Sequence, residues 1–413
     1  MSSVFSIALS SLQADSEAIS TTGNNLANLN TTGYKNNSVN FRDLVAASLG
    51  GSSTGLGVSR PINQQDFSQG ALSSSQSPWA VAIQGNGFFI AQQSNGQQVY
   101  TRDGNFALSR NGTLQTLTGE NVQGWSATAT GINSTVAPGN IILNTGGTIP
   151  PTPTANLSFN ANLNSAGDPT TGSGNLSVPV QVIDSSGNQH TVTIDFTQST
   201  TAGTWNYTVQ IPSSDLASGT GTNTTLTSGS LSFGPNGTLT TASLAPITIP
   251  ITGLADGASN MSIKWNLTNP DGTGAITQFA QNSGSSSLTQ DGLIAGTLTA
   301  LGFGDNGQII AKYSNGQQKT VAQLALATFT NQSSLQDAGN NEFIVTGGTA
   351  PPDIGLSETG NRGHIVNGQL EGSNVNIATQ FTNLIAFQQS YSASSKVITT
   401  ADNMSQDLLQ LIR

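Results

Sequence analysis

The two ends of the chain carry heptad patterns, and these constrain the fold more than any other feature of the sequence. Near the N-terminus, apolar residues recur at heptad spacing: Phe5, Leu9, Leu12, Ile19 and Leu26. Such a repeat is typical of a helix that packs lengthwise against another helix. We therefore predict an N-terminal coiled-coil helix that ends at Gly33, a residue suited to the left-handed position past a helix end.

The C-terminal stripe is longer. No glycine or proline follows Gly372, so about ten helical turns can form there without a break. One face of this segment collects the apolar residues Ile377, Phe381, Leu384, Tyr391, Ile398, Met404 and Leu408. We predict that the two terminal helices pair with each other and that each keeps apolar surface for a neighbouring molecule. Two core helices of one globular domain are the alternative.

The chain between the helices has the pattern of β structure. Asn-Gly pairs, which favour two-residue hairpin turns, recur at Asn86, Asn95, Asn111, Asn236, Asn306 and Asn315. Apolar and polar residues alternate over residues 192–196 and 205–211, which is typical of half-buried antiparallel strands. Pro179, inside a third alternating run, indicates that this strand lies at a sheet edge.

Stretches rich in Ser, Thr, Gly and Pro divide the central chain and bracket a β unit of about 130 residues inserted into another β domain. The predicted fold is mainly β with terminal α-helices that pair as a coiled coil. We predict a terminal coiled-coil assembly domain (1–34 and 370–413), a linker region (35–80 and 356–369), an inner β domain (81–148 and 286–355) and an inserted outer β domain (149–285).

The composition excludes several classes of protein. Charged residues make up 8% of the chain and its net charge is −10, whereas ordinary globular proteins are about 25% charged. Because phosphate binding needs clustered Lys and Arg, we expect no nucleic-acid partner. We also expect no membrane span and no cleaved signal peptide, since the chain has neither a long apolar run nor a basic N-terminal region.

The chain contains no cysteine. This excludes disulfides, thiolate metal sites and a cysteine nucleophile. Two interpretations remain open. The chain is an ordinary cytosolic protein, or it must pass unfolded through a narrow exporter, where cross-links would be harmful.

The sequence indicates no catalytic, cofactor-binding or metal-binding site. His190 and His364 lie far apart without metal-ligand spacing, and we expect His190 to be a surface residue at the start of a strand. Residues 184–187, Asp-Ser-Ser-Gly, lack the later acidic ligands of a calcium loop, and a hairpin turn explains them better. We therefore expect a protein that is not an enzyme and uses no cofactor.

Four motifs, in order along the chain, resemble a single family. They are NNLANLNTTGYK at residues 24–35, AIQGNGFFI at 82–90, YTRDGNFAL at 100–108 and the block LEGSNVNIATQFTNLIAFQQSY from residue 370. Each resembles a signature block of the bacterial flagellar rod and hook proteins. VQVIDSSGNQHTVTIDF at residues 180–196 resembles the inserted outer domain of the hook proteins, which the shorter rod proteins lack.

This resemblance implies a structural role. Hook subunits stack helically into a short tube with the terminal helices as its inner layer, and the tube is a flexible universal joint that carries torque from rod to filament. The implied partners are further copies of the chain, the distal rod protein, the hook cap protein, the hook-filament junction protein and the flagellar type III export apparatus. The implied location is the extracellular hook, reached without a cleaved signal peptide.

Two local roles are also expected. The segment with Phe5 and Leu9 resembles the short Phe-x-x-x-apolar export element of early export substrates, and the first turn of a heptad helix is a compatible alternative. Asn24, Asn25 and Asn28 are expected to hydrogen-bond backbone groups of the paired C-terminal helix or of an adjacent subunit, because amides donate and accept without charge.

Two other functions compete with the hook subunit. Another flagellar axial subunit, from the distal rod or the hook-filament junction, would share the terminal motifs, but the inserted β domain favours the hook. A secreted β-rich adhesin belongs to a different class, and an adhesin needs no heptads at both termini. Short curved tubes in electron micrographs of the purified protein would distinguish a hook subunit from an adhesin.

Overall fold

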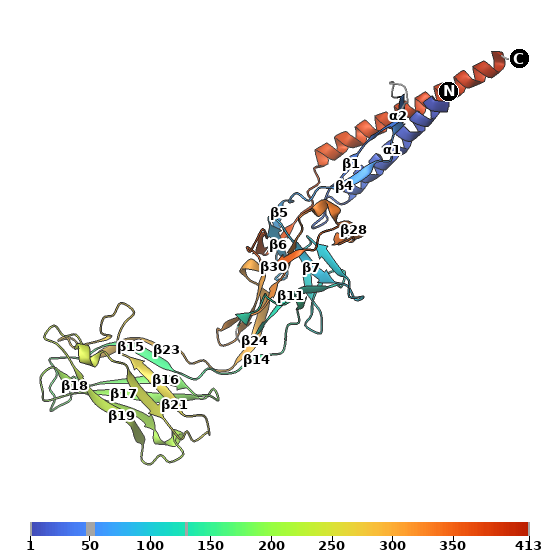
Figure 1. The fold of residues 1–413 in the computed structure, drawn as a ribbon. Helices are drawn as coiled ribbons and strands as arrows, with labels where there is room; N and C mark the ends of the chain where they lie inside the picture. Colours follow the sequence, from blue (N-terminus) through green and yellow to red (C-terminus); the bar gives the residue numbers. More distant parts are fainter. Residues whose placement is uncertain (1, 47–53, 129–130, 412–413) are drawn as a thin grey trace. The chain divides into compact units, whose positions relative to one another are not determined.

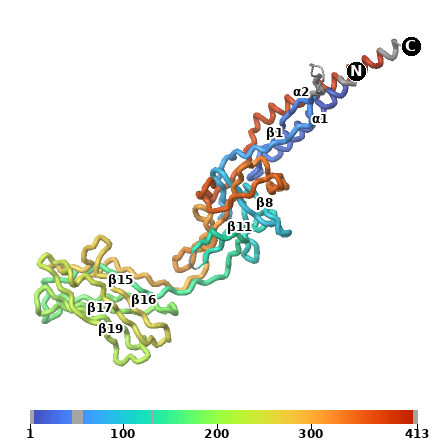
Figure 2. The backbone as a smooth tube through the Cα atoms, viewed as in Figure 1, coloured from blue at the N-terminus to red at the C-terminus, as the bar shows by residue number. Residues whose placement is uncertain are grey.

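A computed structural model of the chain describes residues 2–46, 54–128 and 131–411. The chain divides into two compact units: unit 1 comprises residues 1–145, 300–311 and 318–413, and unit 2 comprises residues 146–299 and 312–317. Unit 1 thus contains both the N-terminal and the C-terminal segments, drawn in blue and red in Figure 2, and unit 2 is inserted between them. The border predicted at residue 285 lies inside β23 (Gly284–Gln290), a strand of unit 2.

Two long helices lie side by side in unit 1 (Figure 1): α1 (Ser2–Ala27) and α2 (Ile377–Leu411). Hydrogen bonds join Ser11 to Ser394 and Asp15 to Ser390, so the two helices run antiparallel. Neither helix carries, within the residues described, an apolar stretch long enough to span a bilayer. The prediction of a mainly β fold with paired terminal helices is confirmed.

Unit 1 also contains short antiparallel strand pairs, which lie in the chain between α1 and α2. They are β1 (Asn37–Asn40) with β4 (Ile62–Gln65), β2 (Asp43–Ala46) with β3 (Thr54–Val58), β5 (Leu72–Ser74) with β32 (Gln369–Glu371), and β6 (Val81–Gln84) with β31 (His364–Asn367). The last two pairs each join a segment near the N-terminus to one near the C-terminus. The backbone N–H of Val58 donates to Ser10 Oγ at 3.2 Å, which fixes β3 against α1.

The main sheet of unit 1 is antiparallel. Its central path is β26 (Gln318–Leu324), β11 (Asn121–Thr128), β7 (Phe88–Gln92), β8 (Gln98–Thr101), β29 (Glu342–Ile344) and β28 (Gln336–Gly339). Shorter strands extend it: β9 (Phe106–Leu108), β10 (Leu114–Thr116), β12 (Gly131–Ile132), β13 (Gly139–Asn140), β27 (Leu326–Thr328) and β30 (Asp353–Gly355). Because β7 is covered on both faces, Phe88 and Phe89 enter two separate cores.

Two β-sheets pack face to face in unit 2. One has the order β16 (Leu176–Ile183), β17 (Gln189–Gln198), β18 (Thr204–Pro212), β19 (Asn223–Ser232). The other has the order β20 (Ile247–Ile251), β21 (Met261–Asn266), β15 (Asn156–Asn162), β22 (Ile276–Thr277), with β23 also beside β15. The remaining strands are β14 (Thr148–Ile149), in unit 2, and β24 (Gly296–Phe303) and β25 (Gln308–Tyr313), which carry the chain between the units.

The core of unit 2 lies between its two sheets. As the alternation predicts, Val192, Ile194 and Phe196 on β17 are fully buried in this core. The ring of Trp265 stacks on that of Phe159, with centroids 5.3 Å apart and planes 12° from parallel. Strand β16, which contains Pro179, is at the edge of its sheet as predicted, so the missing proline N–H costs no ladder hydrogen bond there.

Candidate functional site

The contact between α1 and α2 is made by small and polar side chains. On α1 the buried residues Ala8, Asp15, Ala18, Thr22 and Asn25 follow heptad spacing. The hydrogen bonds from this face to serines of α2 are 2.8–2.9 Å long. Small side chains at this contact let the two helix backbones approach closely.

The predicted N-terminal heptad is therefore displaced from the pairing face. Phe5 and Leu9 are exposed, and Leu12, Ile19 and Leu26 are only partly buried. Ile19 and Leu26 lie one residue after the buried Ala18 and Asn25, and Phe5 and Leu12 precede them at the same seven-residue spacing, so their stripe runs beside the contact with α2. The predicted period is thus present, but these residues do not form the centre of the α1–α2 contact.

The predicted C-terminal residues divide into two groups. Leu384 and Ile398 are partly buried, whereas Ile377, Phe381, Tyr391 and Met404 are exposed, with Phe381 at 52%. Leu408 lies within α2, but its side chain is outside the described residues. Two further apolar residues of α2, Ile385 and Val397, are also exposed. Ile385 was not predicted, although it lies four residues after Phe381 and therefore on the same helix face.

A single chain thus leaves many large apolar side chains of its helices in water. We call these residues the helix apolar set: Phe5, Ile7, Leu9, Ile377, Phe381, Ile385, Tyr391, Val397 and Met404. Burying apolar area gains about 25 cal/mol per Å², so neighbouring chains that covered these side chains would gain free energy from their burial. Exposed apolar clusters of this kind mark interaction surfaces.

Of the three predicted amides, Asn25 is the one that connects segments. Its Nδ2 donates to Asn37 O at 2.8 Å and to Gln380 Oε1 of α2 at 3.2 Å. Its Oδ1 accepts from Asn37 N at 3.0 Å and from the Tyr34 hydroxyl at 3.1 Å. Asn28 instead donates to Asn24 within its own helix end, at 3.0 Å. A role for Asn24 and Asn28 toward a neighbouring subunit stays a prediction.

A buried charge triad joins the helical part of unit 1 to its β structure. Lys35 Nζ lies 2.6 Å from Glu371 Oε1, and Arg102 Nη1 lies 3.3 Å from Glu371 Oε2. Gly70 N donates to the same carboxylate at 2.9 Å, and Lys35 Nζ donates to Ser68 O at 2.8 Å. Burial lowers the pKa values of Lys35 and Arg102, and the Glu371 carboxylate opposes that effect.

Gly33 allows the close approach on which the triad depends. Its φ is +70°, in the left-handed region. The predicted helix end at Gly33 is wrong, because α1 ends at Ala27 and Gly33 lies in the turn that follows it. A Cβ there would lie 2.6 Å from the backbone nitrogen of Asp103, the residue after Arg102. Gly33 N also donates to Glu371 O at 2.8 Å. The segment after α1 thus packs closely against Asp103 of the β structure and is hydrogen-bonded to Glu371, which precedes α2.

Family models match most of the chain. "Flagella basal body rod protein" matches residues 5–35, "Flagellar hook protein FlgE/F/G D1 domain" matches 82–195, "Flagellar basal body protein FlaE D2 domain" matches 156–293, and "Flagellar basal body rod FlgEFG protein C-terminal" matches 366–411. The terminal matches cover most of α1 and all of α2, and the D2 match lies within unit 2.

Relatives match over almost their whole length. The flagellar hook protein FlgE of Escherichia coli (strain K12) is 33% identical over 423 residues, which cover 98% of this chain and 99% of the relative. The chain belongs to the FlgE family of flagellar hook proteins. The FlgE of Treponema pallidum (strain Nichols) is 30% identical over 467 residues and covers both chains in full.

A solved structure shares the fold of this FlgE family member. The crystal structure of Helicobacter pylori flagellar hook protein FlgE2 matches with a TM-score of 0.50 and 15% identity, covering 72% of this chain and 100% of that chain. The family is one of structural subunits of the flagellar hook, and the full-length matches support that function. They do not support the alternative of another axial subunit or an adhesin.

Unit 1 of the chain also contains two carboxyl groups that face each other, those of Glu120 and Glu342. Burial, and then repulsion by Glu120, raise the pKa of Glu342 to about 7. Burial also raises the pKa of Glu120, but hydrogen bonds from Thr116 and Thr118 outweigh that effect and lower it. Glu342 therefore holds its proton in the folded chain at pH values where Glu120 is ionised.

This pair predicts a pH dependence of stability. Glu342 is expected to ionise near pH 4.5 when unfolded and near pH 7 when folded, so the folded chain binds the extra proton between these values. Raising the pH through this window should therefore lower the free energy of unfolding of unit 1, by on the order of 2 kcal/mol. Glu342→Gln should remove this loss, as measured by urea unfolding at several pH values. Glu17→Gln on α1 is the control, and parallel profiles for all three proteins would contradict the prediction.

One expectation about the histidines is wrong. His190 is not a surface residue, because its side chain is buried among Asp184, Asp215 and Asp256 in unit 2. Burial lowers the pKa of His190, but hydrogen bonds to Asp215 and Asp184 outweigh that effect and raise it. The cluster could not be predicted from the sequence, because Asp215 and Asp256 are distant from His190 along the chain. His364 is partly exposed beside Glu358.

Proposed function

We propose that this chain polymerises helically into the tube of the flagellar hook through its terminal helices. The observation that carries the proposal is the helix apolar set, which stays exposed although α1 and α2 are paired. A helical tube needs contacts that repeat without closing into a ring, and unpaired apolar faces on long helices can supply them. Its partners are then further copies of the chain and, at the two ends of the tube, the distal rod, hook cap and hook-filament junction proteins.

The proposed tube is flexible and transmits torque from rod to filament. With 8% charged residues, its subunits offer few ion pairs that would have to break as neighbouring subunits slide during bending. Short polar side chains instead exchange hydrogen bonds with water at little cost. This composition supports a joint that bends while it rotates.

We also propose that the chain reaches the extracellular hook through the flagellar type III export apparatus, without a cleaved signal peptide. Phe5 and Leu9 supply the export element, and both are exposed in the first turns of α1. A chain without cysteine cannot form a disulfide that would obstruct passage through a narrow channel.

Expression in cells that lack their own hook protein tests both proposals. The natural chain should give short curved tubes at the flagellar base in electron micrographs, and their absence despite secretion would contradict the assembly role. Phe5→Ala should retain the protein inside the cell, as measured by immunoblots of cells and medium. Normal secretion of Phe5→Ala without tubes would show that Phe5 serves assembly only.

A further inference from the structure

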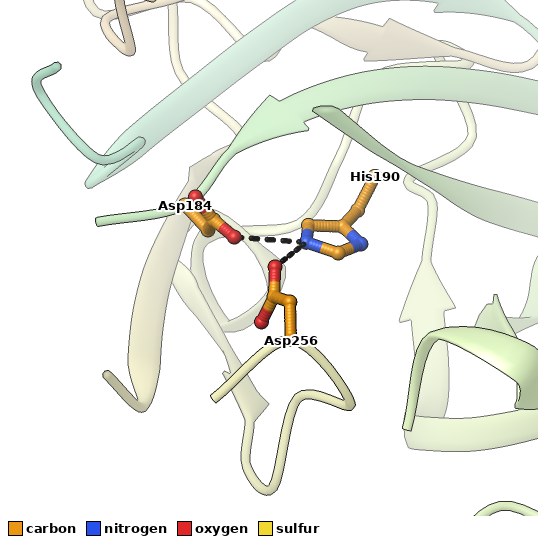
Figure 3. A group of neighbouring side chains, drawn as sticks. All are labelled: Asp184, His190 and Asp256. Atoms are coloured by element: carbon orange, nitrogen blue, oxygen red, sulfur yellow. Dashed lines mark hydrogen bonds and ion pairs between the residues drawn. The ribbon is translucent and has the colours of Figure 1, made fainter. Parts of the chain in front are cut away.

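Three carboxylates surround the buried imidazole of His190, which lies near the start of β17. Its Nδ1 is 3.0 Å from Asp215 Oδ2, at the end of the short 3-10 helix η1 (Ser213–Asp215). Its Nε2 is 3.2 Å from Asp184 Oδ2 and 3.6 Å from Asp256 Oδ2. Figure 3 shows the last two contacts converging on the same ring nitrogen. All four residues belong to unit 2.

The two carboxylates that face Nε2 are held in place from behind. Asp184 Oδ1 accepts from Ser186 N at 2.8 Å and Asn188 N at 2.9 Å, and Asp256 Oδ1 accepts from Ala258 N at 3.0 Å. The Asn188 amide bridges the facing oxygens, at 2.8 Å from Asp256 Oδ2 and 3.4 Å from Asp184 Oδ2. One oxygen of each carboxylate is therefore fixed by backbone, and the other is directed at His190.

A positive charge beside Nε2 would stabilise this arrangement. If Nδ1–H donates to Asp215, a neutral ring directs the lone pair of Nε2 at two carboxylate oxygens. The lone pair and the two anionic oxygens repel one another, and Asp184 is fully buried, so water screens this repulsion poorly. A proton shared within the cluster or a metal cation between the three atoms removes the repulsion.

We infer that Asp184, His190 and Asp256 form a binding site for a divalent transition-metal ion, with zinc as the best fit. Bonds of about 2.0–2.2 Å in a tetrahedron place neighbouring ligand atoms about 3.3 Å apart. The separations of 3.2 and 3.6 Å agree with this, and the three ligand atoms all lie within 4.8 Å of one another. One imidazole and two carboxylates suit zinc, and water would complete the tetrahedron.

Asp215 has the position of an outer partner in this site. A metal-binding histidine commonly donates its other ring N–H to a carboxylate, which fixes the tautomer and the ring orientation. The ion would tie together the β16–β17 turn, strand β17 and the loop at residues 252–260 between β20 and β21. The inference concerns the stability of the inserted unit and is independent of helical assembly.

Zinc titration of the purified full-length chain, after dialysis against a chelator, tests the site. Calorimetry and metal analysis should find one zinc ion per chain, and zinc should raise the unfolding temperature of unit 2. Asp256→Asn should weaken zinc binding at least tenfold. Asp256 is exposed on a loop, so this variant should keep its fold; His190→Gln should abolish binding.

His364→Gln is the matched control, because the chain has two histidines and His364 belongs to unit 1. It should bind zinc as the natural chain does. Nitrogen-15 NMR should show zinc on Nε2 of His190 and a proton on Nδ1. The inference is overturned if no stoichiometric binding occurs at millimolar zinc, which would leave a proton as the occupant. It is also overturned if Asp256→Asn and His190→Gln both bind zinc normally.

Discussion

Replacing Glu371 by alanine is expected to lower the free energy of unfolding of unit 1 by about 3–5 kcal/mol, because it leaves two buried cations without a counter-charge. The side chains of Lys35, Arg102 and Glu371 are at most 2% exposed, so water cannot take over the role of the carboxylate. Glu371→Gln should lose most of the same stability, which would assign the effect to charge rather than to the cavity. Urea unfolding followed by tryptophan fluorescence measures it.

The ion pair between Arg362, whose side chain is 9% exposed, and the exposed Asp353 provides the control. Its N–O distance is 2.8 Å, but Asp353 is 71% exposed, and exposed pairs contribute about 0–1 kcal/mol. Asp353→Ala should therefore cost less than about 1 kcal/mol by the same measurement. Equal losses for Asp353→Ala and Glu371→Ala would contradict the role given to the buried triad.

Replacing Phe381 by serine is expected to impair polymerisation without unfolding the subunit. Half of this side chain is exposed in the single chain, and covering that half with a neighbour gains about 1–1.5 kcal/mol. The critical concentration for tube formation should then rise about tenfold, and about a hundredfold or more if Ile385 is also changed to serine. Sedimentation of assembled tubes measures it.

Gln388→Ser is the matched control, because Gln388 is exposed on the same helix and its loss removes no apolar side chain. It should leave the critical concentration unchanged, and circular dichroism of the monomers should agree among all variants. Normal tube formation by the Phe381→Ser, Ile385→Ser double variant would contradict the assembly role of α2.

The sequence predicted those parts of the fold that depend on local periodicity. The alternation at Val192, Ile194 and Phe196 identified a strand because side chains of a strand point to opposite faces in turn. The heptads identified both helices. They could not identify the pairing face, because periodicity of large apolar residues does not show that Ala8 and Ala18 allow a closer helix contact.

The clusters that depend on distant residues could not be predicted. Lys35 and Arg102 meet Glu371 only after the two ends of the chain come together in unit 1, and no local spacing encodes that contact. Asp256 reaches His190 only through the packing of two sheets. Gly33 was predicted to follow the helix end, but α1 already ends at Ala27, and the close approach of Gly33 to Asp103 depends on the tertiary structure.

A helical reconstruction of the assembled tube tests the central proposal most directly. The exposed residues of the terminal helices, above all Phe5, Phe381 and Ile385, should lie buried against helices of neighbouring subunits. The α1–α2 contact through Asp15 and Ser390 should persist inside each subunit. A tube held together only by the β units, with the three apolar side chains in contact with water, would contradict the proposal.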